Sequence, residues 1–418
     1  MEQYAAILLW AIPGFLIFII IEIVYGHFKN KQTYTFMDTL ASLSSRMTNT
    51  LKDALGIVLV VISYPFILDY LAVIELENSL SLYFIAFICI DFASYWNHRL
   101  NHKINVFWNI HVIHHSSEEY NLACALRQSI SGLLGYGALF LIPAAILGVP
   151  ASIISVLVPL HLFGQFWYHT RHIGKLGWLE YILVTPSQHR VHHAINPVYI
   201  DKNLSAIFCV WDRIFGTFQE ELDDEIPVYG VLKPVQTWNP IWINFQHFWA
   251  IFCDAWHAKR WVDKLRIWFM PTGWRPNDVA ERFPRSITED VHSIEKYNPE
   301  YTFTQKAIGV FHFVAINIMT LYFLSNFGEL SVQFRLIFGL IIFASIFGFT
   351  SLMDLHTWAV KFQIFTGCIG LLLLWIPNEQ PLFAELFTLQ IGLTIYFTFS
   401  LIFTYWNMAA VPSQPQST

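Results

Sequence analysis

Long stretches of this sequence carry almost no charge, and they restrict the chain to structures that can cross a lipid bilayer. Of its 418 residues, 55% are hydrophobic and only 13% are charged. Runs of about 17–25 apolar residues are long enough to span the hydrocarbon core as helices, which satisfy their own backbone hydrogen bonds there. We therefore predict an all-α, polytopic integral membrane protein built as a helical bundle. The candidate segments are 4–25, 53–74, 80–96, 307–325, 333–350, 359–376 and 383–406.

A longer apolar stretch, 132–166, is interrupted by Pro143, Gly148 and Pro150. Proline and glycine break regular helices, so this stretch is predicted as a hairpin of two short membrane segments. The total is then about nine spans, counted at the length that a bilayer requires.

Lysine and arginine are distributed unevenly between the loops. Most of them lie in 26–52, 97–131 and 167–306, whereas the short loops near 326–332 and 377–385 contain none. Cytoplasmic loops carry an excess of Lys and Arg. We therefore expect the cationic segments, which contain every histidine cluster described below, to face the cytoplasm.

The same features divide the chain into five parts. They are 1–79, the N-terminal transmembrane segments; 80–225, a histidine-rich core; 226–306, an aromatic-rich interfacial region; 307–410, a C-terminal transmembrane bundle; and 411–418, a tail rich in Pro, Gln and Ser that is predicted to be disordered.

Histidines are concentrated in three short motifs: HRLNH at 98–102, HVIHH at 111–115 and HRVHH at 189–193. Spacings of three and four residues place imidazoles on one face of a helix, and imidazole is the commonest metal ligand among side chains. The set is too large for one tetrahedral zinc, so we predict two metal ions, with the adjacent HH pairs directed toward different ions. The predicted ligands are His98, His102, His111, His114, His115, His169, His189, His192 and His193.

Spacing alone does not select the metal, because imidazole suits iron, zinc, copper and nickel. A histidine-rich dimetal site at a membrane surface is well placed to activate O2, which dissolves in lipid. Attack on an aliphatic C–H bond requires a redox-active metal, which zinc is not. We therefore predict two iron ions, which zinc can replace in a purified preparation. The sequence contains no HExxH motif, which a zinc hydrolase would typically show.

The order HxxxH, HxxHH, a single His and a second HxxHH, beside spanning segments, resembles the fatty acid hydroxylase / sterol desaturase superfamily of membrane di-iron enzymes. The core resemblance covers about residues 80–220. Within that superfamily, the longer strings are similar to the subgroup that oxidises alkylglycerols. These strings are HVIHHSSEEYNL at 111–122, ALRQS at 125–129, TPSQHRVHH at 185–193, DKNL at 201–204 and WDRIFGTF at 211–218.

The resemblance implies that region 80–225 is a di-iron catalytic core that hydroxylates a lipid with O2 and an external reductant. It implies no catalytic groups beyond the metal ligands. Hydroxylation beside an ether oxygen would give a hemiacetal that collapses to an aldehyde and an alcohol. The pterin-dependent animal enzymes are expected to carry Glu after the second His of HxxxH, and this chain has Lys103 there. That difference leaves tetrahydrobiopterin an open question.

The expected partners are a lipid that enters from the bilayer and an external electron donor, since the sequence contains no nucleotide-binding motif of its own. A net charge of -6 gives no indication of a nucleic-acid partner. The sequence does not determine the oligomeric state. A bacterial chain would lie in the inner membrane and a eukaryotic one in the endoplasmic reticulum.

Two further predictions concern the surroundings of the metals. Six residues near the ligands could support them through hydrogen bonds, although the acidic ones could equally belong to a solvated loop. Segment 238–261 places aromatic residues at helical spacing and could lie in the membrane interface or pack on the catalytic core. The six candidate supporting residues are Glu118, Asn121, Gln165, His172, Gln188 and Asp201.

Two alternatives remain open at this stage. Within the superfamily, the substrate could be a sterol, a fatty acyl chain or a carotenoid, hydroxylated or desaturated by the same site. From another class, a metal transporter or sensor would require polar residues along the spans to form a path. The late segments contain few such residues, among them His312 and Asn317, which disfavours the transporter.

Overall fold

The computed structural model describes residues 2–74, 76, 79–285, 288, 290–375 and 387–408, so the tail predicted at 411–418 lies outside the described residues. Helices dominate these residues, as predicted. Their one two-stranded sheet pairs β1 (Leu59–Val60) with β2 (Leu134–Gly135) in parallel. The α-helices are α1 Glu2–Phe28, α2 Phe36–Ala54, α3 Tyr64–Leu71, α4 Leu80–Lys103, α5 Asn105–His115, α6 Ile142–Ile146, α7 Ala151–Phe163, α8 Pro186–His193, α9 Val210–Phe215, α10 Pro240–His257, α11 Trp261–Arg266, α12 Asn277–Arg282, α13 Phe303–Ser325, α14 Val332–Met353, α15 Thr357–Trp375 and α16 Phe387–Met408. The 3-10 helices are η1 Cys124–Leu126, η2 Gly137–Leu141, η3 Gly177–Tyr181 and η4 Val291–Ser293.

Among the described residues, six helices are long and apolar enough to cross a membrane. They confirm the prediction of an integral membrane protein, although their number is below the about nine spans expected from apolar runs alone. The 132–166 stretch contains two shorter apolar helical segments, Gly137–Ile146 and Ala151–Phe163, as the predicted hairpin requires. The six candidate spans are Ala11–Phe28, Leu80–Lys103, Phe303–Ser325, Val332–Met353, Thr357–Trp375 and Thr388–Trp406.

The span predicted at 53–74 is wrong. Helix α2 ends at Ala54, and Gly56 then adopts a positive φ of 65° that a helix cannot continue. The next residues pair as β1, and Pro65 in the first turn of α3 starts a separate helix of eight residues. Apolar composition could not reveal this break, because each short piece is as hydrophobic as a continuous span.

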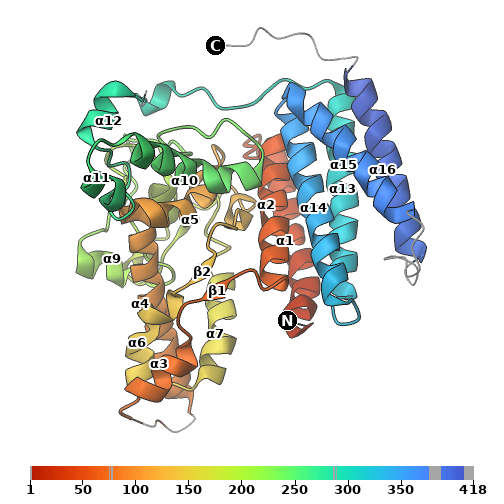
Figure 1. Cartoon of the computed structure of the whole chain (residues 1–418). Helices are drawn as coiled ribbons and strands as arrows, with labels where there is room; N and C mark the ends of the chain where they lie inside the picture. The colour runs from red at the N-terminus through yellow and green to blue at the C-terminus, as the bar shows by residue number, and fades with distance from the viewer. Residues whose placement is uncertain are drawn as a thin grey trace.

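Figure 1 shows two groups of helices standing side by side, with α1 and α2 between them. One group contains α3, α4, α6 and α7, and the other contains α13 to α16. Helix α10 lies across the end of α4 in the first group and packs against α5, which follows directly on α4. The histidine motifs of α4 and α5 are therefore located where the membrane-spanning helix gives way to the covering layer.

A buried carboxylate on α4 holds three parts of the histidine-rich core together. Asp91 is fully buried and accepts hydrogen bonds from His161 Nε2 on α7 at 2.7 Å and from Trp211 Nε1 at 2.9 Å. It also accepts the backbone N–H groups of Ile207 at 2.9 Å and Phe208 at 3.0 Å. A buried carboxylate with all of its oxygens engaged is costly to disrupt, so Asp91 fixes the 207–211 segment against the spanning helices.

Helix α2 was not predicted, because its sequence is polar rather than apolar. In the structure it is almost entirely buried, with Asp38, Ser42, Ser45 and Thr48 facing other protein groups. Asp38 forms an ion pair of 2.6 Å with Arg127, close to the second histidine motif. Its burial and its ion pair with Arg127 show that this polar helix supports the core and is not a solvent-exposed linker.

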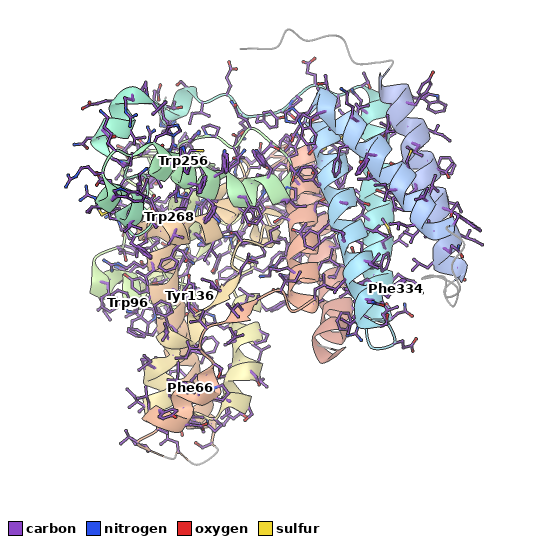
Figure 2. All side chains as sticks on the ribbon, in the orientation of Figure 1. Phe66, Trp96, Tyr136, Trp256, Trp268 and Phe334 are labelled. Atoms are coloured by element: carbon purple, nitrogen blue, oxygen red, sulfur yellow. The ribbon has the colours of Figure 1, made fainter. Side chains whose placement is uncertain are left out.

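The aromatic segment predicted at 238–261 is helical as α10. Its Ile243 and Ile251 are buried, whereas Trp249 and Trp256 on the other side are 57% and 72% exposed. Figure 2 shows Trp256 on α10 at the opposite end of the molecule from Phe66 on α3. One side of the helix thus packs on the core while the other presents aromatic rings outward.

We predict that Gly370→Ala destabilises the C-terminal bundle. A Cβ at Gly370 on α15 would collide with the ring of Phe397 on α16, which is itself buried. Overpacking of this kind costs about 1–3 kcal/mol, so the apparent unfolding temperature of detergent-solubilised protein should fall. Gly392→Ala on α16 is the matched control, because a Cβ there meets nothing within 4 Å. Equal unfolding temperatures for the two variants would contradict the prediction.

Candidate metal centre

Three helices and one loop supply the histidines of the site. Helix α4 ends at Lys103 and α5 begins at Asn105, so a single extended residue, Ile104, turns the chain between the first two motifs. Because α4 and α5 are packed together, His98 and His102 at the end of α4 face the histidines of α5. Helix α8 contributes the third motif, and the loop after α7 contributes the single histidine.

The nine histidines predicted as ligands form two adjacent groups, and within each group the candidate ligand atoms lie within 4.8 Å of one another. The adjacent histidines of each HH pair are divided between the groups, so one helix supplies ligands to both. The ring of His115 in one group stacks on the ring of His193 in the other, with centroids 4.4 Å apart. The first group contains His98, His102, His111, His115 and His192, and the second contains His114, His169, His189 and His193.

The Nε2 atoms converge within each group. His98 Nε2 lies 2.8 Å from His111 Nε2, and His115 Nε2 lies 3.1 Å from the same atom. In the second group, His189 Nε2 lies 3.0 Å from His169 Nε2 and 3.1 Å from His193 Nε2. Such convergent nitrogen lone pairs repel one another unless a cation or protons lie between them.

Backbone carbonyls determine which nitrogen of each imidazole faces the centre. In the first group, His98 Nδ1 donates to the Leu204 carbonyl at 2.8 Å and His192 Nδ1 donates to the Lys202 carbonyl at 3.0 Å. A carbonyl can only accept, so Nδ1 carries the proton and the Nε2 lone pair is left for a metal. His102 Nδ1 lies 3.4 Å from the Asp201 carboxylate. One loop, Asp201–Leu204, therefore orients three ligands, and we call it the orienting loop.

The orienting loop is itself fixed from several sides. Asp201 and Asn203 adopt left-handed φ values of 57° and 51°, which Asp and Asn tolerate better than most residues. The buried Asp212 carboxylate accepts the N–H groups of Leu204 at 2.7 Å and Ser205 at 3.0 Å. Lys103 Nζ contacts the outer oxygen of Asp201 at 2.6 Å.

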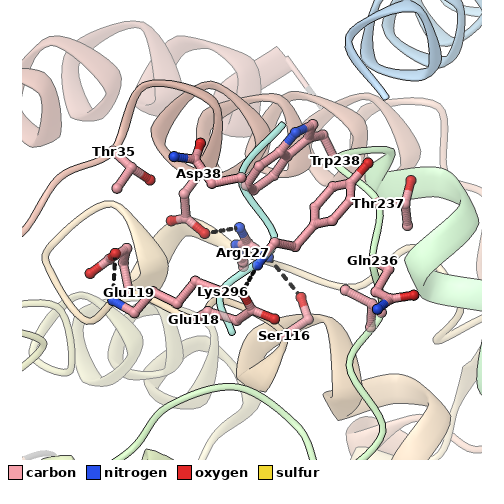
Figure 3. Close-up of a pocket in the computed structure, with 13 residues that line it drawn as sticks. Thr35, Asp38, Ser116, Glu118, Glu119, Arg127, Gln236, Thr237, Trp238 and Lys296 are labelled. Carbon is pink, nitrogen blue, oxygen red and sulfur yellow. Dashed lines mark hydrogen bonds and ion pairs between the residues drawn. The ribbon is translucent and has the colours of Figure 1, made fainter. Parts of the chain in front are cut away.

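The second group has no such carboxylate among the partners described. His169 Nδ1 donates to the Gln165 carbonyl at 3.0 Å, and His114 Nδ1 lies 3.3 Å from the Arg127 carbonyl. The Arg127 side chain lines a small polar pocket of 70 Å³, where it is paired with Asp38 and with Ser116 at 2.8 Å (Figure 3). Helix α2 thus supports the candidate ligand His114 through Arg127.

Electrostatics favour neutral imidazoles at this site. Burial, and then the neighbouring histidines, lower the pKa values of His115, His189 and His193 well below the usual range. A neutral imidazole is the form that binds a metal. Buried Nε2 atoms of His102 and His192 also lack a hydrogen-bond partner. Neutral, convergent and unsatisfied nitrogens of this kind fit two metal ions that prefer imidazole ligands.

Aromatic rings surround the imidazoles and separate them from solvent. The ring of Trp108 lies 5.1 Å from that of His102, and the ring of Tyr168 lies 4.2 Å from that of His189. Tyr120 packs against His193 with ring centroids 5.3 Å apart. Both tyrosines are almost completely buried.

Of the six residues predicted to support the ligands, two contact them. Asp201 reaches His102 through its carboxylate, and Gln165 reaches His169 through its backbone carbonyl. The other four contact different groups. Glu118 accepts the Tyr297 N–H, Asn121 donates to the Thr33 carbonyl, Gln188 donates to the Glu180 carbonyl and His172 packs on Tyr25.

Sequence reasoning missed the carbonyls of Lys202, Leu204 and Arg127, because any residue type has a carbonyl. It also missed Asp212, whose only signal is its place in the WDRIFGTF string. His161, which pairs with Asp91, lies in an apolar segment without a second histidine nearby.

Comparison with known proteins agrees with this geometry. A family model described as "Fatty acid hydroxylase" matches residues 83–217, which contain all nine histidines. Alkylglycerol monooxygenase from Homo sapiens is 30% identical over 413 residues, covering 96% of this chain and 88% of the human protein. The same enzyme from Xenopus tropicalis is 35% identical over 303 residues, covering 72% of this chain and 67% of the frog protein. An ornithine lipid hydroxylase from Rhizobium tropici is 29% identical over 31% of this chain. No solved structure matches the chain.

The fold and the histidine-rich centre are those of an integral membrane enzyme with a candidate metal site. The chain belongs to the fatty acid hydroxylase / sterol desaturase superfamily and aligns over almost its whole length with alkylglycerol monooxygenases within it. It is an oxygen-dependent lipid monooxygenase, which replaces the alternative of a metal transporter or sensor.

We predict that His192→Ala lowers the metal content of the purified protein, because His192 Nε2 is a buried, unpartnered nitrogen of the first group. His172→Ala is the matched control, since His172 is a neighbouring histidine outside both groups. Elemental analysis of both variants measures the difference. A metal content in His192→Ala equal to that of His172→Ala would refute the assignment of His192.

We further predict that Asp201→Asn weakens metal binding in the first group. An amide is isosteric but lacks the charge that supports His102, and such outer partners typically change metal affinity by about 10–100-fold. Chelator competition followed by metal analysis measures the affinity. Asp223→Asn is the control, because the Asp223 side chain is 96% exposed and pairs only with Lys175 among the contacts described. Equal affinity in both variants would show that the Asp201 charge has no role.

Proposed function

We propose that this protein is an iron-dependent monooxygenase that hydroxylates an alkylglycerol on the carbon beside its ether oxygen. The observation that carries this choice of substrate is the extent of the similarity. The human alkylglycerol monooxygenase aligns over 96% of this chain, whereas an Aspergillus fumigatus sterol desaturase aligns over 34%. The first relative therefore shares the C-terminal bundle as well as the histidine-rich core.

The proposed metals are two iron ions, held by the two histidine groups. Iron fits an imidazole-rich donor set, and when bound it would supply the redox chemistry that O2 activation requires. The protein's own contribution is to orient five of the imidazoles through Nδ1 and to surround the site with aromatic rings that exclude water. The five are His98, His102, His114, His169 and His192. Zinc satisfies the same donors but cannot change its oxidation state, so zinc-loaded protein should be inactive.

The overall reaction consumes one O2, two electrons and two protons. One oxygen atom is inserted into a C–H bond to give a hydroxyl group, and the other leaves as water. The hydroxylated ether is a hemiacetal, which breaks its C–O bond to release a fatty aldehyde and glycerol. No protein nucleophile is required for that last step, in agreement with a site whose polar groups are metal ligands and their supports.

We place the site on the cytoplasmic side, where an external reductant can reach it. The support is the uneven distribution of Lys and Arg. The exposed rings of Trp249, Phe252 and Trp256 on α10 would lie in the membrane interface, beside the route by which a lipid enters. The host membrane would be the inner membrane of a bacterium or the endoplasmic reticulum of a eukaryote.

The test is turnover of iron-loaded protein with a 1-O-alkylglycerol, O2 and a panel of reductants. We expect a fatty aldehyde whose carbonyl oxygen derives from isotopically labelled O2, trapped by immediate reduction to the alcohol. The matched 1-O-acylglycerol is the control substrate, because its ester carbon has no C–H bond to attack. Oxidation of a sterol or a free fatty acid, with none of the alkylglycerol, would assign another substrate and refute the proposal.

A further inference from the structure

Helix α11 and the residues that follow it present large apolar side chains to the outside of the molecule. Trp261, Leu265 and Phe269 follow one another at intervals of four residues and are 77%, 70% and 70% exposed. Asp263 and Ile267 between them are buried, so the segment has an inner and an outer side. Helix α11 packs against α10, whose exposed rings continue the outer side. Exposed apolar patches of this kind mark interaction sites.

Cations surround these apolar side chains. The segment 259–266 contains four cations and a single carboxylate, that of Asp263. Asp263 pairs with Arg266 at 2.7 Å and reaches Arg260 only at 4.0 Å. Lys259 and Arg260 are exposed, and neither side chain has a carboxylate closer than 4.0 Å among the described residues.

Neighbouring groups leave most of this positive charge in place. Lys264 Nζ donates to the backbone carbonyl of Trp256 at 2.7 Å, a contact that does not neutralise the ammonium group. Asp278 accepts the Lys259 backbone N–H at 3.1 Å, but its carboxylate is paired with Arg282 at 2.8 Å. The apolar side chains of α11 are therefore bordered by an excess of positive charge.

Hydrogen bonds place this segment at the end of a membrane-spanning helix. Helix α4, a candidate span, ends at Lys103. The Lys103 carbonyl accepts the Thr272 N–H at 3.1 Å, and the Asn105 N–H donates to the Met270 carbonyl at 3.0 Å. Figure 1 shows α10 and α11 at this end of α4, opposite α3. The segment after α11 is thus bonded to the residues that follow the span, which favours a lipid leaflet over a soluble protein as the binding partner.

We propose that the outer side of α11 and the end of α10 dock on the leaflet where α4 ends and select anionic phospholipid headgroups. The aromatic and aliphatic side chains enter the boundary between headgroups and acyl chains, and the cations remain at the phosphates. Basic clusters directly beside a spanning helix bind anionic lipids in this way. The inference concerns how the catalytic core sits on the membrane and does not depend on which lipid is oxidised. We call this the basic aromatic surface; its residues are Trp256, Lys259, Arg260, Trp261, Leu265 and Phe269.

The experiment is photocrosslinking from benzoylphenylalanine placed at position 262, where Val262 is exposed beside this surface. The full-length protein is reconstituted in nanodiscs that contain equal amounts of phosphatidylcholine and phosphatidylglycerol, and one or the other lipid carries an alkyne for detection. We expect about fivefold more adduct with phosphatidylglycerol, which is roughly the preference that one cation at a membrane surface supplies. High salt should lower this ratio in the same protein, because it screens exposed charges.

Two charge reversals separate this surface from the net charge of the protein. Lys259→Glu with Arg260→Glu should bring the ratio of the two lipid adducts close to one while the metal content stays at the wild-type value. Lys29→Glu with Lys31→Glu is the matched control, because it changes the net charge equally at exposed positions after α1. The control should keep the wild-type ratio.

Equal amounts of the two adducts in the protein without charge reversals would overturn the proposal, as would equal ratios in the two charge-reversed variants. The absence of any lipid adduct at position 262 would show that the surface faces water or protein, and would overturn it as well. Lipid oxidation is not measured, so failure of the proposed substrate would leave these outcomes unchanged.

Discussion

The structure depends on the orientation of imidazoles by groups that can only accept a hydrogen bond. Where a carbonyl or carboxylate binds Nδ1–H, the Nε2 lone pair must point toward the centre, and in each group these lone pairs meet. Their convergence is unfavourable unless a cation or protons lie between them, which fits a site built to hold metal ions. Three carboxylates on different segments stabilise this arrangement: Asp91, Asp212 and Asp38. Each is a buried carboxylate that fixes a segment carrying an acceptor or a ligand.

The two metal groups are built differently. The first has five histidines, a carboxylate beside His102 and one loop that orients three ligands. The second has four histidines, orienting carbonyls from separate segments and stacked tyrosines at its outer side. The carboxylate beside the first group pairs with Lys103, whereas Tyr120 and Tyr229 stack at the outer side of the second group.

Several parts of the fold and site were predictable from sequence, for identifiable reasons. Apolar runs indicated the six long helices and the 132–166 hairpin, since lipid leaves few alternatives. The histidine spacing indicated eight of the nine candidate ligands, because a helix repeats its face every three to four residues. The ninth, His169, was predicted from its place at the end of an apolar segment. The span at 53–74 failed because hydrophobicity does not encode the turn at Gly56. Helix α2 was missed because a buried polar helix looks like an exposed one until its partners, such as Arg127, are known.

The sequence by itself determined the class of protein, and it predicted the candidate ligands and the division of each HH pair between two groups, because these follow from composition and helical periodicity. Tertiary structure decided what holds the ligands, since backbone carbonyls from the orienting loop have no side-chain signature. It also decided which residues contact the candidate ligands. Asp201 contacts His102, although 99 positions separate them in the sequence (201 minus 102). His172 is only three positions from His169 but packs against Tyr25 instead. Closeness in the sequence is a weak guide to closeness in space once helices that are distant in the sequence pack together.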